Sequence, residues 1–412
     1  MKNFTGSKLV LNAARLLLVV FAVGMALSST INNSLAAQKS NRSAFAALPR
    51  PGSIHLSVSH RAFSGSGTHY LYVDDGTSPD SIDVYAVTST ITHVGNFPND
   101  ASRNTAYYGA TTLAVARANA THGACVLLTD NNGFVDSFSI KARGGLSPEI
   151  SHIADGGAPV DVAVATSGNI AYVTTPGVDL ESYSIGSGCV LTLLNTLSTT
   201  NQQYFSFALP SSTRLVAPDF NTGNIDTYTL GSGGAITFLS SVAGQIGSPD
   251  SITLQTAHTA SGTVTNVFTG QATASAPQNQ GGQYKKKKGS IAFLAGSPSS
   301  DPSGSNGAAV TFDSKDSLLI QGEQYTNALG VYAVTPGVPG TAGSISFMEQ
   351  TPLAVSNEAP LDFAQLGSTL FVNQTYNGDL EACTMSSSGI SGCNTVATLT
   401  SIDGIESGLA LL

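Results

Sequence analysis

Residues 180–185 read LESYSI, a six-residue stretch in which apolar and polar side chains alternate. Successive copies of this pattern begin 45 to 53 residues apart, except for one interval of 104 residues. That interval predicts a degenerate copy between residues 231 and 328, formed by residues 264–268 and, after an insertion, by GSIAFL (289–294). The other copies are IDVYAV (82–87), VDSFSI (135–140), IDTYTL (225–230), LGVYAV (329–334) and LEACTM (380–385). Together they predict seven repeats.

Each copy has the same neighbours, which indicate four short strands in every repeat. An apolar strand begins nine to eleven residues earlier, as in LYV (71–73), AYV (171–173) and LFV (370–372), and a turn rich in Gly, Asn and Asp separates the two. A third strand follows the copy, and a fourth precedes the apolar strand. Units of four strands and about 50 residues are typical of propeller blades. We therefore predict an all-β fold, a seven-bladed β-propeller of four-stranded antiparallel blades that spans residues 55–412.

The composition supports this class of fold and excludes others. Only 10% of the residues are charged, whereas 41% are hydrophobic, which is enough to bury a core. The formal net charge of −9 at pH 7 argues against a nucleic-acid-binding protein, because such proteins need a basic face that displaces counterions. The absence of Trp argues against a propeller of the WD40 type. Amphipathic helical stretches are missing between the strands, so a parallel α/β repeat is disfavoured.

The first residues have the features of a secretory signal peptide. Lys2, Lys8 and Arg15 precede the apolar run LLLVVFAVGMAL (16–27), which is short for a membrane span, and the residues at 34–36 offer a cleavage site. We expect residues 1–36 to be a signal peptide, residues 37–54 a flexible leader, and the mature chain to be secreted without a membrane span. An uncleaved N-terminal anchor is the alternative.

The four cysteines suit an oxidising compartment. Cys383 and Cys393 flank a turn rich in Gly and Ser between two β-like runs, so antiparallel pairing would bring them close enough for a hairpin disulfide. Cys125 and Cys189 lie far apart in the sequence, and their pairing stays open at this point. The C-x₂-C spacing of a zinc site is absent.

Residues 271–288, QATASAPQNQGGQYKKKK, interrupt the repeat pattern. We expect them to form a polar, low-complexity insertion in one blade. The segment ends in four lysines at 285–288. This run of charge is either a solvated loop or a basic anchor for an acidic partner or an anionic surface.

The apolar-aromatic-Val strand, the Asn/Gly turn and the hexapeptide together resemble those of the lactonase-type seven-bladed propellers. This family includes 6-phosphogluconolactonase-like, carboxymuconate-cyclase-like and related YVTN-repeat proteins, and the likeness covers nearly the whole mature chain. The resemblance implies lactone hydrolysis by a cluster of His, Arg and Glu at the mouth of the central channel. Where the enzymes of the family carry Pro-His at the start of the inner strand, this sequence reads PVD (159–161), PD (249–250) and PLD (360–362).

The aspartates of these segments, Asp161, Asp250 and Asp362, are the candidate catalytic residues. They belong to three blades, and inner strands that begin at the prolines would bring them toward the channel mouth. Carboxylates gathered in a poorly hydrated funnel raise one another's pKa, so one of them could act as a general base toward water. They could equally hold Ca²⁺, or accept bonds from backbone N–H groups in a structural role. His93 and His152 are further candidates for the channel rim.

Two functions are compatible with these features. The first is a hydrolase that opens a small, non-phosphorylated lactone, since a phosphorylated one would need Arg or Lys for its phosphate and the candidate mouth is acidic. The second is a non-catalytic extracellular scaffold that binds a surface or a protein partner. A fold alone does not separate the two. We expect a monomer in either case, with Ca²⁺ as the one cofactor to consider.

Overall fold

The computed structural model describes residues 54–55, 68–74, 81–98, 112–130, 133–271, 276–304, 307–313, 315, 317–323, 326–354, 360–374, 379–398 and 409–412. The chain divides into two units, Met1–Pro49 and Arg50–Leu412. The expected signal peptide and, apart from Ile54, the expected leader lie outside the described residues. No helix in the described part of the chain is long and apolar enough to cross a membrane.

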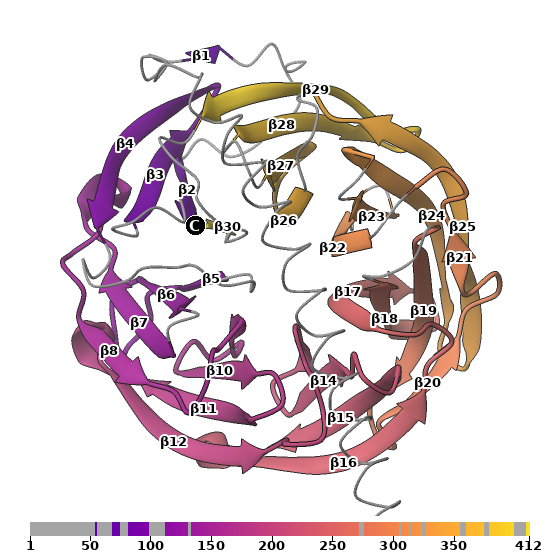
Figure 1. The fold of residues 1–412 in the computed structure, drawn as a ribbon, viewed down its shortest axis with the longest axis horizontal. Coiled ribbons are helices and arrows are strands. Elements are labelled where there is room, and N and C mark those ends of the chain that lie inside the picture. The colour runs from indigo at the N-terminus through magenta and orange to yellow at the C-terminus, as the bar shows by residue number, and fades with distance from the viewer. Residues whose placement is uncertain are drawn as a thin grey trace, which may run out of the picture. The chain divides into compact units, whose positions relative to one another are not determined.

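Seven antiparallel sheets follow one another around a ring in the second unit, which confirms the predicted seven-bladed propeller (Figure 1). In six blades the strands run in chain order from the centre to the outer edge. Short 3₁₀ turns precede the fourth strand in three blades: η1 (Ala142–Gly144), η2 (Ser187–Cys189) and η3 (Ser232–Gly234). Blade two contains β5 (Leu113–Ala116), β6 (Cys125–Asp130), β7 (Phe134–Ser139) and β8 (Ser151–Ala154). Blade three contains β9 (Asp161–Val164), β10 (Ile170–Thr175), β11 (Asp179–Ile185) and β12 (Leu191–Ser198). Blade four contains β13 (Ala208–Ser211), β14 (Arg214–Pro218), β15 (Asn224–Leu230) and β16 (Ile236–Ala243).

The last three blades have the same plan with longer hairpins. A short additional strand, β21 (Ser299–Ser300), pairs with the third strand of blade five. Blade five contains β17 (Pro249–Thr259), β18 (Gly262–Gln271), β19 (Gln278–Lys285) and β20 (Ser290–Phe293). Blade six contains β22 (Gly307–Asp313), β23 (Leu318–Glu323), β24 (Ala328–Val338) and β25 (Thr341–Pro352). Blade seven contains β26 (Pro360–Leu366), β27 (Thr369–Gln374), β28 (Asp379–Ser386) and β29 (Gly389–Thr398).

The first blade is built from both ends of the propeller unit. Its inner strand is β30 (Leu409–Leu411), followed toward the outside by β2 (His69–Asp74), β3 (Ser81–Val87), β4 (Thr90–Pro98) and β1 (Ile54–His55). Backbone bonds in both directions between Tyr70 and Leu412, of 3.2 and 3.0 Å, extend the pairing of β30 with β2. The last strand of the chain therefore closes the ring.

Buried hydroxyls join neighbouring blades at a fixed position of the repeat. In three copies the third residue of the hexapeptide is Ser or Thr, and its hydroxyl donates to a carbonyl in the turn before the fourth strand of the next blade. The accepting residues have φ values of 62° to 84°, a region that favours glycine. The three pairs are Ser137 Oγ to Cys189 O (2.7 Å), Ser182 Oγ to Gly234 O (2.7 Å) and Thr227 Oγ1 to Gly289 O (3.1 Å).

Both pairs of cysteines form disulfides. Cys383–Cys393 joins neighbouring strands of blade seven, which confirms the predicted hairpin disulfide. Cys125–Cys189 ties the second strand of blade two to the η2 turn of blade three. Because Cys189 is also the acceptor of the Ser137 hydroxyl, blades two and three are held together by a covalent bond and a hydrogen bond at one turn.

The structure differs from the insertion expected at 271–288. Residues Gln278–Lys285 form β19, the third strand of blade five, which pairs with β18 and β20. Three of its buried side chains are amides, and two of them bond to side chains of other strands: Asn279 Nδ2 donates to Gln321 Oε1 of β23 in the next blade at 2.7 Å, and Gln280 Nε2 donates to Thr269 Oγ1 of β18 at 2.9 Å. Hydrogen bonds between buried amides take the place of apolar contacts, so the strand has no hydrophobic alternation in its sequence.

Two glycines let this polar strand pack closely. A Cβ at Gly281 would lie 2.6 Å from the Phe268 ring, and one at Gly282 would lie 2.1 Å from the Ile291 side chain. The neighbouring apolar side chains therefore fill the space that a side chain on β19 would occupy.

Replacing Ser182 with Ala should lower the free energy of unfolding by about 1–3 kcal/mol, because the buried Gly234 carbonyl loses its donor. The matched control is Ser184→Ala in the same strand, where the hydroxyl contact to Thr192 O is exposed and 3.4 Å long, and we expect a change within about 0.5 kcal/mol. Urea denaturation followed by circular dichroism measures both. Equal losses in the two variants would contradict the inter-blade link.

Removing Cys125–Cys189 by double substitution to Ala should cost about 4 kcal/mol of unfolding free energy, against about 3 kcal/mol for Cys383–Cys393. The reason is that the first disulfide closes a sequence separation of 64 residues and the second one of 10, so the first restricts the unfolded chain more. Denaturation of the two double variants gives the comparison. A larger loss for the hairpin disulfide would contradict this reasoning.

Candidate functional site

The three candidate aspartates stand near the starts of inner strands. Asp161 is the first residue of β9, Asp250 the second of β17 and Asp362 the third of β26. Because every blade repeats the same antiparallel order, these strands begin at one end of the ring, around the centre seen in Figure 1. We call this end, where the inner strands begin and the second strands finish, the acidic face.

Asp161 links three consecutive blades. Its Oδ1 accepts a bond from Thr112 Oγ1 next to β5 at 3.2 Å, and its Oδ2 accepts one from the backbone N–H of Phe207 next to β13 at 2.9 Å. Thr112 in turn accepts a bond from the N–H of Val162 at 2.9 Å. Burial raises the pKa of Asp161 to about 6, although these hydrogen bonds favour its charged form. Both carboxylate oxygens thus have structural partners.

Asp250 lies in an irregular part of its strand. The register of β17 against β18 shifts between Pro249 and Ser251, which leaves Asp250 as the extra residue of a β-bulge. The preceding Ser248 has a φ of +48°, which is uncommon for a residue other than glycine. The Oδ1 atom of Asp250 is buried and has no hydrogen-bond partner. Burial raises the pKa of this carboxyl well above its usual value.

Asp362 follows a second irregularity of the same kind, a register shift in β26 between Pro360 and Asp362. Its side chain is half-buried, and its Oδ1 accepts a bond from the N–H of Phe363 at 2.7 Å. Among the three candidates, Asp250 alone combines a buried, unpartnered oxygen with a raised pKa.

The electrostatic cause also differs from the one that the sequence suggested. Burial is the first cause of the raised pKa values of Asp161 and Asp250, rather than repulsion between clustered carboxylates. A carboxylate that water solvates poorly is a stronger base than an exposed one, and at Asp250 burial outweighs the hydrogen bond from the Ser251 side chain, which lowers the pKa. Asp250 has this environment.

Sequence reasoning missed other buried carboxylates at the acidic face. Glu323 ends β23 and is 0% exposed, and its Oε2 accepts bonds from Gln350 Nε2 at 2.6 Å and Thr326 Oγ1 at 2.8 Å. Burial, together with the nearby carboxyl of Asp301, raises the pKa of Glu323 to about 7. Asp301 is itself 0% exposed, and its Oδ2 has no partner. Glu323 therefore favours its neutral form up to about pH 7.

A second group of acids gathers at the same face of blade three. The pKa of Asp179 is raised to about 7, first by burial and then by the charges of Asp155 and Glu181. The sequence signal for these groups is an acid directly after an apolar second strand, as in LLIQGE (318–323), or beside the first apolar residue of the hexapeptide, as in LESYSI.

The histidines proposed for the channel rim lie elsewhere. His93 and His152 belong to β4 and β8, fourth strands of their blades, so the interpretation of both as rim residues is wrong. Their ring nitrogens contact buried carboxylates, Asp83 at 2.8 Å and Asp136 at 2.9 Å. His152, Asp136 and Glu149 could hold a metal ion at the outer part of blade two, since their ligand atoms lie within 4.8 Å of one another.

No model of a protein family and no curated protein matches the sequence. Solved structures with the same fold do match. A candidate 6-phosphogluconolactonase from Bacteroides fragilis superposes with a TM-score of 0.65 at 11% identity, over 85% of this chain and 99% of its own. A protein from Lactobacillus plantarum superposes with a TM-score of 0.63 at 18% identity, over 84% of this chain and 99% of its own. A periplasmic gluconolactonase from Pseudomonas aeruginosa superposes with a TM-score of 0.59 at 15% identity, over 83% of this chain and 99% of its own. The chain has the fold of the lactonase-type propellers.

Replacing Glu323 with Gln should stabilise the protein above pH 7 and leave it nearly unchanged at pH 5. A raised pKa means that the folded state prefers the neutral carboxyl, so this stabilisation is present below the ordinary pKa and is lost as the pH rises through about 7. The amide stays neutral, so the variant should gain about 1–3 kcal/mol over the wild type at pH 8. Urea denaturation at both pH values measures the gain. A variant less stable than the wild type at pH 8 would contradict a carboxyl that prefers to be neutral.

Proposed function

We propose that this protein is an extracytoplasmic hydrolase of small, non-phosphorylated lactones, with Asp250 as the general base at the acidic face. The lactonase-type fold supports the choice of reaction. Two disulfides support the compartment, because such bonds persist in oxidising surroundings. The observation that carries the proposal is the Asp250 carboxyl group, with its buried, unpartnered Oδ1 and its raised pKa.

The reaction needs one group that takes a proton and returns it. Asp250 accepts a proton from water while the water oxygen bonds to the carbonyl carbon of the lactone. The tetrahedral intermediate then collapses, the ring C–O bond breaks, and the leaving oxygen receives the proton from Asp250 to become a hydroxyl. A carboxyl whose pKa is raised above that of an ordinary aspartate is a stronger base toward water, which suits the first transfer.

Asp161 and Asp362 have structural roles beside this site. Asp161 holds its inner strand to the neighbouring blades through Thr112 and the N–H of Phe207, whereas Asp362 bonds within its own strand to the N–H of Phe363. In this proposal they are positioning residues around Asp250, since a base must be held within hydrogen-bond reach of the water that it activates.

The negative charge of the acidic face disfavours phosphorylated lactones as substrates. Asp130, Asp219 and Glu323 close the second strands of three blades at this end. In the part of this face that the structure describes, a phosphate group would meet carboxylates instead of the Arg or Lys that bind phosphate. Neutral sugar lactones and aryl lactones are the substrates that fit.

Asp250→Asn should lower kcat/KM on a hydrolysed lactone by about 10²–10⁴-fold, because the amide cannot take the proton from water. The purified protein is assayed against a panel of sugar and aryl lactones, and in the wild type kcat/KM should rise with pH through a pKa above the usual aspartate range. The matched control is Asp379→Asn, a buried carboxyl with a raised pKa in the third strand of blade seven, which should retain activity.

Assays with and without EDTA separate proton transfer from metal binding, because carboxylate oxygens also suit Ca²⁺. Activity that is lost in EDTA and restored by Ca²⁺ would assign these carboxylates to the ion. Full activity of Asp250→Asn would contradict the role of Asp250. No turnover of any lactone by folded protein would favour the non-catalytic scaffold.

A further inference from the structure

The charges of the propeller are divided between its two ends. Every Lys and Arg among the described residues lies in or beside a connection between the first and second or the third and fourth strands of a blade. All these connections lie at the end opposite to the acidic face, because the strands are antiparallel. We call this end the basic face, and it carries Arg117, Lys141, Arg143, Arg214, Lys285, Lys286, Lys287, Lys288 and Lys315.

Few carboxylates oppose these charges. Asp313 ends β22 at this face, and it accepts bonds from Gln365 Nε2 at 2.6 Å and from the N–H of Lys315 at 3.0 Å. Glu149, in the connection before β8, contacts the His152 ring at 3.2 Å. The lysines at 285–288 form no ion pair with any carboxylate that the structure describes.

The charge is densest at the β19–β20 hairpin. Lys285, Lys286, Lys287 and Lys288 are all exposed there. Arg214, at the start of β14 in the neighbouring blade, donates from Nε to the carbonyl of Lys286 at 3.2 Å. Two blades thus present five cationic side chains in one patch, and an anion that binds there reduces the repulsion between these like charges.

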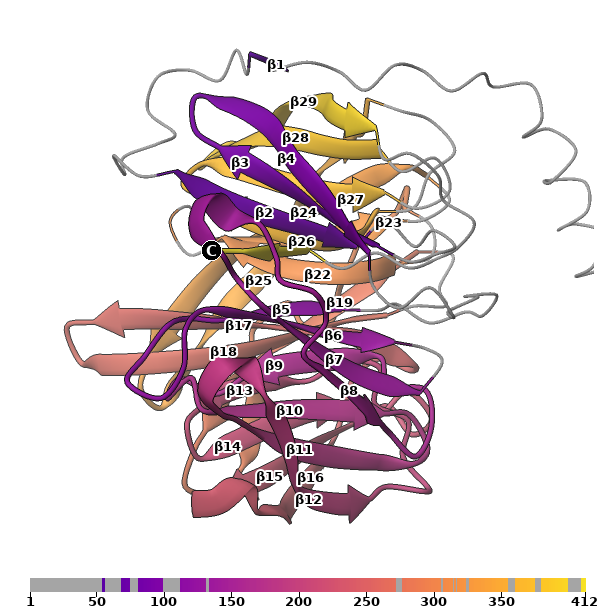
Figure 2. The same cartoon turned by 90° about the vertical axis from the view of Figure 1, so that its left-hand side faces the viewer.

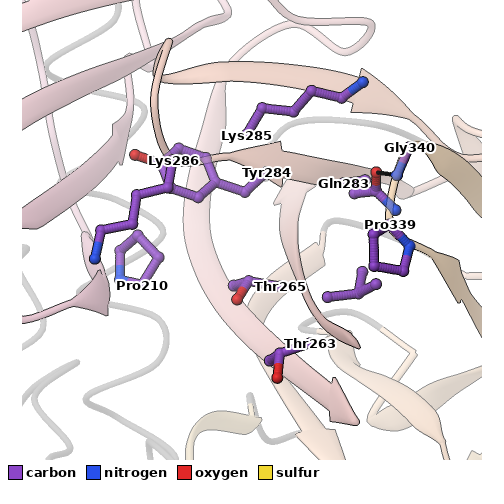
Figure 3. Close-up of a pocket in the computed structure, with 10 residues that line it drawn as sticks. Pro210, Thr263, Thr265, Gln283, Tyr284, Lys285, Lys286, Pro339 and Gly340 are labelled. Atoms are coloured by element: carbon purple, nitrogen blue, oxygen red, sulfur yellow. Dashed lines mark hydrogen bonds between the residues drawn. The ribbon is translucent and has the colours of Figure 1, made fainter. Parts of the chain in front are cut away.

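A cavity of about 370 Å³ lies beside this hairpin (Figure 3). Lys286 and Pro210 lie on one side of it, Gln283 and Pro339 on the other, and Thr263 and Thr265 between them. The Gln283 amide is held in place, since its Nε2 donates to Val338 O at 2.8 Å and its Oε1 accepts from the Gly340 N–H at 3.0 Å. Ammonium and hydroxyl groups are suitable donors to a phosphate.

Exposed aliphatic side chains accompany the charges. Val338, at the tip of the β24–β25 hairpin beside the cavity, is 40% exposed, and Val190, in the β11–β12 turn, is 49% exposed. Figure 2 shows the propeller edge-on, with the β17–β18 hairpin and the C-terminus at this end on the left. Basic and apolar side chains on one surface are the combination that binds the interface of a bilayer.

We propose that the basic face binds the surface of an anionic phospholipid bilayer, with the phosphate of one head group in the cavity beside Lys286. A polyanion in solution could bind the lysines but would not bury the side chains of Val190 and Val338. The interface of a bilayer provides anionic head groups for the lysines and an apolar region for the two valines. Binding in this orientation leaves the acidic face directed away from the membrane. The proposal stands independently of the proposed hydrolase.

The test is co-sedimentation of the full protein with phosphatidylcholine vesicles that contain or lack phosphatidylglycerol. We expect binding that requires the anionic lipid and weakens as the salt concentration rises. Replacing all four lysines (K285Q, K286Q, K287Q, K288Q) should lower the partition coefficient by at least about a hundredfold, since each contributes about fivefold. The matched control replaces the same four with Arg and should bind as the wild type does, because it keeps the charge.

Two further measurements identify the anion and the apolar contact. Val338→Asp should weaken vesicle binding at least about tenfold without changing thermal stability, because Val338 is exposed. Equal binding to vesicles with and without phosphatidylglycerol would overturn the proposal. So would binding to dextran sulfate, or to inorganic phosphate, by a protein that does not sediment with anionic vesicles.

Discussion

The pairing of β30 with β2 is the contact on which the ring depends. Leu409–Leu411 supplies the inner strand of the first blade, so the chain must return to its beginning before that blade is complete. The contact joins residues far apart in the sequence, so the chain loses conformational entropy when the ring closes. The pairing offsets this loss together with the core around Leu71 and Phe371, which joins blades one and seven. Once it forms, each blade is covered on both sides by its neighbours.

That geometry explains why so many carboxylates are buried. The second residue of the hexapeptide lies on the third strand near the acidic face, on the side that faces the preceding blade, and it is buried there in Asp136 and Glu181. Their partners are ring nitrogens and hydroxyls: His152 for Asp136, and Thr196 and Tyr183 for Glu181. The described cations lie at the other end of the ring, so burial raises pKa values at the acidic face with no ammonium or guanidinium group to lower them.

The sequence predicts the architecture well because a propeller repeats one pattern, and six clear hexapeptides fix the spacing of the blades. It fails at β19, where Asn279 and Gln280 replace apolar residues with bonded amides that carry no hydrophobic period. The candidate site is only partly predictable. The motif places Asp161 and Asp250 at inner-strand starts, but whether an oxygen has a partner depends on Thr112 and Phe207, from other blades. No local pattern encodes such contacts.

The two faces of the ring are formed by different connections between strands, and these connections differ in charge. Among the described residues, connections between blades and between second and third strands carry most of the acids, whereas connections inside the hairpins at the other end carry the lysines and arginines. Folding does not require this division, because exposed side chains such as Lys287 contact nothing that the fold needs. Separation of charge with no structural benefit indicates two surfaces with different tasks. An acidic end repels anions from the region of Asp250, and a basic end attracts an anionic surface to the opposite side of the ring.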